Sequence, residues 1–232
     1  MQTHRMSVVP LDGARGTGKS ALASGIRSRF GCAVLDLGPV FRLIAWLRLQ
    51  EPKHELRSAI NILAAGIASE RFEIQLDRSC GMAATNILIE GRPAEGQLWA
   101  PALAEELPEV SNSQEAISAV REISYSLVGL RRTVVVGRQA GRTFFPNAHL
   151  KIFLSSDAEA RRSRKQRQLE DHGYGVDAPS LERLDLSEVA CEAEGAVTIN
   201  TTRLSAAALL DLVSSLIISN VGWKAMTEEA TS

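Results

Sequence analysis

The sequence predicts an α/β fold with a parallel sheet of about five strands flanked by helices. Short apolar runs rich in β-branched residues alternate with helical segments, which is typical of strands covered on both faces. The runs are residues 6–11, 32–37, 133–137, 150–154 and 196–201. Two further segments, 71–77 and 85–91, alternate apolar and polar residues around a turn-rich stretch. This alternation predicts a small antiparallel pair inserted into the α/β core.

Helices are predicted between these strands from apolar periodicity and capping residues. The segments are 18–30, 39–50, about 113–130, and the stretch after Ser205, which we expect to be its N-cap. Proline lacks the amide hydrogen that a ladder bond needs, so we expect the first strand to stop pairing near Pro10.

The amino-acid composition and net charge of the chain argue against several classes of function. The chain has 232 residues, 45% of them hydrophobic, and a net charge of −1. This balance gives no charge-driven attraction to nucleic acid or membranes, and no apolar run reaches the length of a signal peptide or membrane span. Cys32, Cys80 and Cys191 are far apart, which favours reduced, buried thiols. We expect a cytoplasmic monomer with no nucleic-acid or membrane partner.

The stretch GARGTGKS, residues 13–20, follows the first predicted strand and opens the first predicted helix. In this context backbone N–H groups and the helix N-terminus wrap a phosphate, Lys19 reaches the outer phosphates, and the Ser20 hydroxyl takes a metal ion. The candidate nucleotide-binding residues are Gly13, Ala14, Arg15, Gly16, Thr17, Gly18, Lys19 and Ser20. The loop alone leaves open whether a phosphoryl group is transferred, hydrolysed or only held.

With the segments that follow it, this loop resembles the bacterial cytidylate (CMP/dCMP) kinases. The family begins with Asp-Gly-Pro-x-Gly-x-Gly-Lys-Ser, and the matching residues here are Asp12, Gly13, Gly16, Gly18, Lys19 and Ser20. Its next signature, Asp-(Ser/Thr)-Gly-x-x-Tyr-Arg, is matched at Asp36, Gly38, Phe41 and Arg42. A Val-Arg pair at 120–121, the block 134–173 and INTTRLS at 199–205 follow in the family's order.

The resemblance implies a P-loop nucleoside monophosphate kinase fold that uses ATP and Mg²⁺ and closes a lid over a nucleotide substrate. It implies a core at 1–69 and 131–232, with the lid at about 173–194, and an acceptor-binding insert at 70–130. The implied catalytic residues are Lys19, Arg138, Arg161 and Arg164, with Ser20 on the metal. The implied substrate-binding residues are Arg42, Arg121, Gly137, Arg138 and Gln139. Such chemistry is mostly positioning and charge stabilisation.

The departures from the family concentrate where the acceptor nucleotide would bind. The family's Asp-Gly-Arg-Asp block reads Val-Gly-Arg-Gln at 136–139, and its hydroxyl residue after Asp36 is Leu37. The lid segment 181–196 is acidic and keeps one arginine, Arg183. Three readings stay open: a CMP or dCMP kinase with reduced activity, an ATP-binding protein without kinase activity, and a kinase for another small acceptor.

The remaining acidic, aromatic and histidine side chains were considered for functional roles. Asp12 and Asp36 are the nearest candidates for a charge beside Mg²⁺. The three tryptophans, Trp46, Trp99 and Trp223, are expected to pack rather than stack on a base. The four histidines, His4, His54, His149 and His172, have no metal-site or triad spacing.

Overall fold

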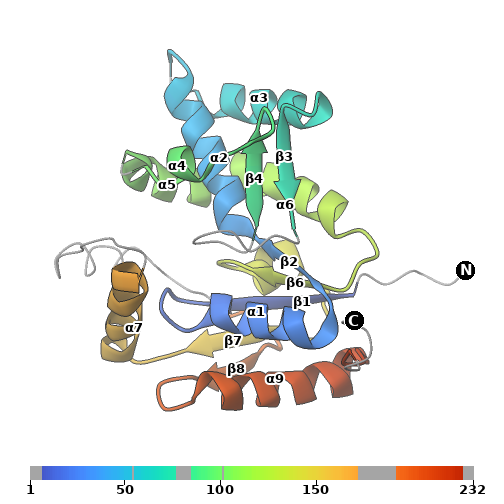
Figure 1. The fold of residues 1–232 in the computed structure, drawn as a ribbon. Coiled ribbons are helices and arrows are strands. Elements are labelled where there is room, and N and C mark those ends of the chain that lie inside the picture. The colour runs from blue at the N-terminus through green and yellow to red at the C-terminus, as the bar shows by residue number, and fades with distance from the viewer. Residues whose placement is uncertain (1–6, 54, 77–84, 101, 172–191, 227–232) are drawn as a thin grey trace, which may run out of the picture. The chain divides into compact units, whose positions relative to one another are not determined.

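The structure, a computed structural model, describes residues 7–53, 55–76, 85–100, 102–171 and 192–226, which form two units (Figure 1). The first unit is Met1–Cys32 with Leu130–Ser232, and the second is Ala33–Gly129. The predicted lid at 173–194 lies outside the described residues except for 192–194. Within the described ranges, no helix is long and apolar enough to cross a membrane.

A five-stranded sheet forms the centre of the fold, as predicted. Its order is β2 (Ala33–Asp36), β6 (Thr133–Val136), β1 (Val8–Gly13), β7 (Ile152–Ser155) and β8 (Val197–Asn200). β1 pairs in parallel with β6 and with β7, and Leu11 lies opposite both Val136 and Ile152. β7 pairs in parallel with β8. Buried β-branched and leucine side chains line β1 and β6, which explains why these segments could be recognised as apolar runs.

The expectation that β1 would stop pairing near Pro10 is wrong, because β1 continues to Gly13 and Pro10 lies opposite Val135. In a parallel strand, successive residues direct their backbone groups to opposite neighbours. The carbonyl oxygens of Ser7 and Leu11 accept from the amides of Thr133, at the start of β6, and Gly137, directly after it, so Pro10 faces the β7 side. The ladder with β7 begins only at Leu11 and Ile152. Proline therefore removes no ladder bond at this position.

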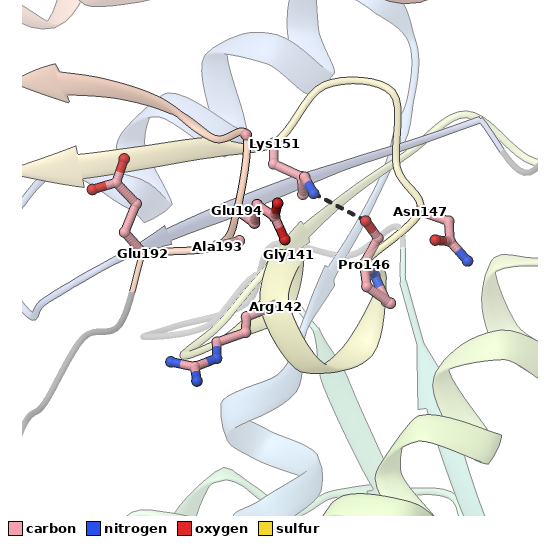
Figure 2. A pocket seen from close by; sticks show the side chains of 9 residues that line it. Gly141, Arg142, Pro146, Asn147, Lys151, Glu192, Ala193 and Glu194 are labelled. Atoms are coloured by element: carbon pink, nitrogen blue, oxygen red, sulfur yellow. Dashed lines mark hydrogen bonds between the residues drawn. The ribbon is translucent and has the colours of Figure 1, made fainter.

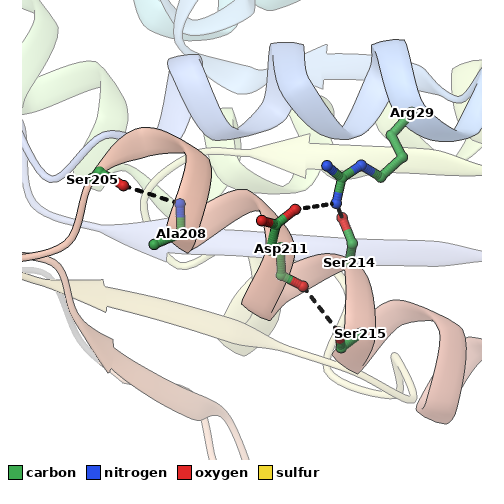
Figure 3. A network of polar contacts seen from close by, with 6 residues as sticks. All are labelled: Arg29, Ser205, Ala208, Asp211, Ser214 and Ser215. Carbon is green, nitrogen blue, oxygen red and sulfur yellow. Dashed lines mark hydrogen bonds and ion pairs between the residues drawn. The ribbon is translucent and has the colours of Figure 1, made fainter.

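The helices of the first unit are α1 (Lys19–Phe30), the π-helical turn η1 (Ala140–Phe144), α7 (Ala158–Asp171) and α9 (Ala206–Val221). α1 and α9 pack side by side along the sheet (Figure 1). Arg29 of α1 joins them, since its Nη1 lies 2.8 Å from Asp211 Oδ1 and 2.9 Å from Ser214 Oγ (Figure 3). The predicted N-cap of α9 is confirmed, because Ser205 Oγ accepts from the Ala208 amide at 3.1 Å.

The second unit combines helices with a small antiparallel sheet. Besides β2, its elements are α2 (Leu37–Gln50), α3 (Leu56–Ala68), β3 (Phe72–Gln75), β4 (Asn86–Ile89), β5 (Arg92–Pro93), α4 (Glu95–Leu98), α5 (Leu103–Asn112) and α6 (Gln114–Val128). The predicted antiparallel pair is confirmed as β3 and β4, and β5 adds a third strand. By its contacts the unit begins at Ala33, because α2 packs against α3, α4, α5 and α6. The acceptor-binding role expected for residues 70–130 stays a prediction.

The cysteine and tryptophan side chains near the sheet are structural. Cys32 is free and buried, and burial raises the pKa of its thiol to about 11. Trp223 is 2% exposed, meets Phe30 edge-on, and donates from Nε1 to Ser7 Oγ at 2.6 Å. Trp223 therefore packs, as predicted. Cys80, Cys191 and three of the four histidines lie outside the described residues.

Candidate functional site

The Gly-rich loop connects β1 to α1 and has the backbone of a phosphate-binding turn. Gly13, Gly16 and Gly18 have φ values of 140°, 74° and 98°, which L side chains rarely adopt. Gly18 is the N-cap residue of α1, so the helix begins directly after the loop. Its first amides receive no hydrogen bond from a capping side chain. The loop therefore combines backbone of the left-handed region with the N-terminus of α1, an arrangement that suits an anion.

Two of these glycines also permit close approach by other segments. A Cβ on Gly13 would lie 2.3 Å from the Leu154 carbonyl oxygen at the end of β7. A Cβ on Gly16 would lie 2.6 Å from the Arg161 carbonyl oxygen in α7. Any larger residue would push the loop away from both elements. The loop is therefore held by β7 and by the first turns of α7 as well as by its own sequence.

Lys19 and Thr17 fold back onto the loop. Lys19 Nζ donates to the carbonyl oxygens of Gly13 at 2.6 Å and Ala14 at 2.7 Å. Thr17 is 1% exposed, and its hydroxyl donates to the Ala14 carbonyl oxygen at 2.8 Å. Ser20 is exposed at the second residue of α1. The ammonium group of Lys19 is therefore already placed over the loop, and the Ser20 hydroxyl is accessible to a ligand.

Arg164 connects α7 to the loop and to the turn after β8. Its Nη2 donates to the Thr201 carbonyl oxygen at 2.6 Å, and its Nη1 donates to Thr201 Oγ1 at 3.0 Å and more loosely to the Gly16 carbonyl oxygen at 3.5 Å. Thr201 Oγ1 lies 3.0 Å from the Thr17 carbonyl oxygen. Arg161 follows the same face of α7 and lies 3.4 Å from the Ser156 carbonyl oxygen. Both predicted arginines therefore lie beside the phosphate loop.

The turn after β6 carries the predicted residues Gly137, Arg138 and Gln139, and it is held from β1. Gln139 adopts a left-handed conformation with φ 59°, and its Oε1 accepts from the Thr143 hydroxyl at 2.8 Å. Asp12, which is 2% exposed, accepts the amide of Ala140 at 2.6 Å on Oδ1 and the amide of Gly141 at 2.8 Å on Oδ2. Burial raises the pKa of Asp12 to about 6, although both amide hydrogen bonds and Lys19 act to lower it.

The second unit holds the other two predicted arginines. Arg42 of α2 stacks over Trp99, with its guanidinium carbon 4.0 Å from the ring centroid, and donates to the Leu98 carbonyl oxygen at 3.1 Å. Arg121 lies on α6, and its buried Nε has no hydrogen-bond partner among the residues that the structure describes. An unsatisfied buried guanidinium nitrogen is costly and is what an incoming anion would satisfy. Asp36, a candidate for a charge beside Mg²⁺, caps α2 through Gly38 at 2.9 Å.

A cavity of about 770 Å³ lies elsewhere in the first unit (Figure 2). Its lining residues are Gly141, Arg142, Pro146, Asn147, Lys151, Glu192, Ala193, Glu194 and Gly195. Lys151 is directed to the Pro146 carbonyl oxygen at 3.0 Å, as Figure 2 shows. The lining has two cations and two carboxylates and includes none of the predicted site residues. This cavity therefore lacks the excess positive charge that a phosphate group would need.

The residues of the loop suit a nucleotide and its metal ion. The left-handed glycines, the ammonium group of Lys19 and the exposed hydroxyl of Ser20 supply amide donors, a cation and an oxygen ligand, respectively. No group of three or more His, Cys, Asp or Glu side chains that could hold a metal occurs within the described ranges. A metal at this loop would therefore depend on Ser20, phosphate oxygens and water, which is the usual pattern for Mg²⁺ with a nucleotide.

Some contacts at the site were not predictable from the sequence. Trp99 stacks on Arg42 although it belongs to no motif described above, and the motif INTTRLS at 199–205 gave no indication that its Thr201 would hold Arg164. Asp12 was recognised as a possible charge for Mg²⁺, whereas the structure joins its carboxylate to η1. The partner residues are 128 and 129 positions away in the chain, so no local signal could have indicated them.

The chain is similar to cytidylate kinases along nearly its whole length. Residues 9–219 match the cytidylate kinase family. The chain is 28% identical to the cytidylate kinase of Streptomyces griseus subsp. griseus over 94% of this chain and 95% of that protein. It is 26% identical to the cytidylate kinase of Chlamydia caviae over 92% of this chain and 99% of that protein. Together with the phosphate loop, this match shows that the chain belongs to the cytidylate kinase family of nucleoside monophosphate kinases.

Proposed function

We propose that the chain transfers the γ-phosphoryl group of Mg²⁺–ATP to CMP or dCMP. The observation that carries this proposal is the loop between β1 and α1, where glycines with positive φ, the ammonium group of Lys19 and the exposed hydroxyl of Ser20 lie together. Family membership supports a nucleotide kinase reaction. The cytosine nucleotide as acceptor follows from what the named relatives phosphorylate and is the part that needs testing.

Each proposed role uses a charge that matches phosphoryl transfer. Lys19 would contact the transferred group, and Ser20 would supply an oxygen ligand to Mg²⁺, which when bound would draw charge away from the bridging phosphate oxygens. Arg138 and Arg161 would face the reacting phosphates, with Arg164 beside them. A further set would bind the acceptor nucleotide: Arg42, Arg121, Gly137, Arg138 and Gln139. The unpartnered Nε of Arg121 supports its contact with a phosphate.

We also propose that CMP is a poor acceptor. Gln139 stands where the family has a carboxylate, and its Oε1 already accepts from Thr143. Leu37 is 1% exposed and offers no hydroxyl. Each missing hydrogen bond costs about 1 kcal/mol or more, and more for a charged partner. The resulting kcat/KM for CMP should be at least about a hundredfold below that of a relative with the intact motif.

The occupied oxygen of Gln139 favours a second candidate, a kinase for another small phosphorylated acceptor. A carboxylate accepts two hydroxyl hydrogens of a ribose, whereas this amide has its carbonyl oxygen engaged within the turn. An acceptor with a different hydroxyl pattern would not need that carboxylate. An ATP-binding protein without kinase activity is the remaining possibility.

A coupled assay of ADP release against a panel of nucleoside and sugar monophosphates separates these candidates. The expected result is release with CMP or dCMP above the rate without acceptor. A larger rate with another acceptor would overturn the cytidylate assignment. ATP binding by calorimetry, with no ADP release for any acceptor, would leave only the binding role. The Lys19→Ala variant is the control, because it should weaken ATP binding in every case.

A further inference from the structure

One carboxylate links the nucleotide loop to the turn that carries the proposed acceptor residues. Asp12 directly precedes Gly13, the first residue of the loop, and each of its two carboxylate oxygens accepts one backbone amide from the start of η1. The carboxylate is 2% exposed, so water does not compete for these hydrogen bonds. Two short bonds to successive amides fix both the position and the orientation of the turn.

The turn needs such an external support. Gln139 has a left-handed conformation, which costs a non-glycine residue free energy that the surroundings must supply. The Gln139 backbone oxygen accepts from Thr143 at 2.7 Å, and its side chain accepts from the hydroxyl of the same residue. These bonds close the turn on itself. The contacts of Asp12 attach the closed turn to β1.

We infer that Asp12 is a positioning residue, whose ionised carboxylate holds Arg138 and Gln139 in the place required for binding the acceptor. This inference rests on the proposed function of those two residues. A carboxylate can accept from both amides because both oxygens are acceptors. A protonated Asp12 would turn one oxygen into a donor that faces an amide hydrogen. One of the two bonds would then be lost, and the turn would be attached at a single point.

The charged groups around Asp12 and its burial determine the pH at which its carboxylate takes up a proton. Lys19 of α1 and the turn residues Arg138 and Arg142 are cationic, as is Lys151, whose aliphatic carbons pack beside Gly141. Two exposed carboxylates, Glu192 and Glu194, line the same cavity as Gly141. β6 and β7 contribute no charged side chain, because their sequences are TVVV and IFLS. Burial raises the pKa of Asp12 to about 6, so the carboxyl should titrate in a range where the enzyme can be assayed.

The first test compares wild type with Asp12→Asn between pH 5 and pH 8. We expect kcat/KM for the acceptor to fall below about pH 6 in wild type. In Asp12→Asn the acceptor KM should rise about tenfold at pH 7.5, and the fall of kcat/KM below about pH 6, the acid limb of the profile, should disappear. The dissociation constant of ATP should change less than about twofold. Glu192 and Glu194 remain in this variant, so a limb that is lost belongs to Asp12. Glu55→Gln, an exposed carboxylate before α3, is the matched control and should change none of these values. An unchanged acid limb, or an equal loss of ATP and acceptor affinity, would overturn the inference.

The second test needs neither a variant nor an acceptor. In the NMR spectrum of the wild-type protein, the amide protons of Ala140 and Gly141 should titrate together near pH 6, because both are donated to the titrating carboxylate. Titration near pH 4, or none, would refute the coupling. Absence of kinase activity toward any monophosphate would refute the proposed function and leave this titration unaffected, so the two failures can be told apart.

Discussion

The raised pKa of Asp12 also predicts how the stability of the fold depends on pH. An ordinary aspartate has a pKa of 3.8, and the buried carboxyl of Asp12 has a pKa of about 6. The folded protein therefore binds this proton more tightly than the unfolded chain does. Linkage then requires that the stabilisation is fully present below about pH 4 and is lost as the pH rises through about 6.

The size of the effect follows from the change in pKa. Each tenfold change in proton affinity is worth about 1.4 kcal/mol, so a pKa that moves from 3.8 to about 6 corresponds to about 3 kcal/mol. The side chain is 2% exposed, so no reduction for solvent screening is needed. In Asp12→Asn the titrating group is absent. The variant should therefore gain about 3 kcal/mol relative to wild type between pH 4 and pH 8, whatever its stability at the starting pH.

Urea denaturation at closely spaced pH values measures this difference directly. The free energy of unfolding of Asp12→Asn minus that of wild type should rise with pH, with its midpoint between about pH 4 and pH 6. For Glu55→Gln the same difference should stay flat, since that carboxylate is exposed. Parallel wild-type and Asp12→Asn curves would show that the carboxyl titrates normally, and the burial argument would be wrong.

Further predictions concern the loop and the arginines around it. Gly16→Ala should lower the free energy of unfolding by about 2 kcal/mol or more, because its Cβ would meet a carbonyl oxygen of α7 at 2.6 Å. The control is Gly91→Ala, where φ is 74° but the Cβ would meet open space. It should lower the free energy of unfolding by only about 1 kcal/mol in the same denaturation assay. Lys19→Ala should weaken ATP binding about 10- to 100-fold by calorimetry, from the loss of about 1.5–3 kcal/mol, and equal affinities would exclude the loop as a phosphate site. Arg164→Ala should lower the free energy of unfolding by about 2–3 kcal/mol, which an unchanged urea midpoint would contradict. Trp99→Leu should raise the acceptor KM about fivefold, because Arg42 would lose a cation–π contact worth about 1 kcal/mol. An unchanged KM would show that Trp99 does not position Arg42 for the acceptor.

The parts of the fold that could be predicted are those whose signal is local. The five strands of the parallel sheet follow apolar runs, and the loop at 13–20 has a spacing that few other structures need. The N-cap of α9 was also recognisable, since Ser205 directly precedes an apolar helical segment. In each case the residues that determine the element lie within or next to it.

The parts that could not be predicted depend on contacts between distant segments. The π-helical turn η1 is held by Asp12 from β1, and Arg42 is oriented by Trp99 from another helix. Pro10 was misread for a similar reason, because its cost depends on which neighbouring strand its nitrogen faces and where that strand begins. Helix α4 has only four residues, too few to show a helical periodicity. Helix α5 was not predicted, although Leu103, Leu107 and Val110 are spaced as on one helix face.

The hydrogen bonds of the two best-placed cations suggest different functions for them. Lys19 donates to carbonyl oxygens of the loop itself, Gly13 and Ala14, so both of these hydrogen bonds lie within one segment. A charged phosphate oxygen is also a stronger acceptor than a neutral carbonyl. Arg164, by contrast, joins α7 to Thr201 after β8 and to Gly16 in the loop. Removing it from these carbonyl oxygens would detach three segments at once. Lys19 is therefore suited to follow the transferred phosphoryl group, whereas Arg164 is suited to keep the loop in place while it does so.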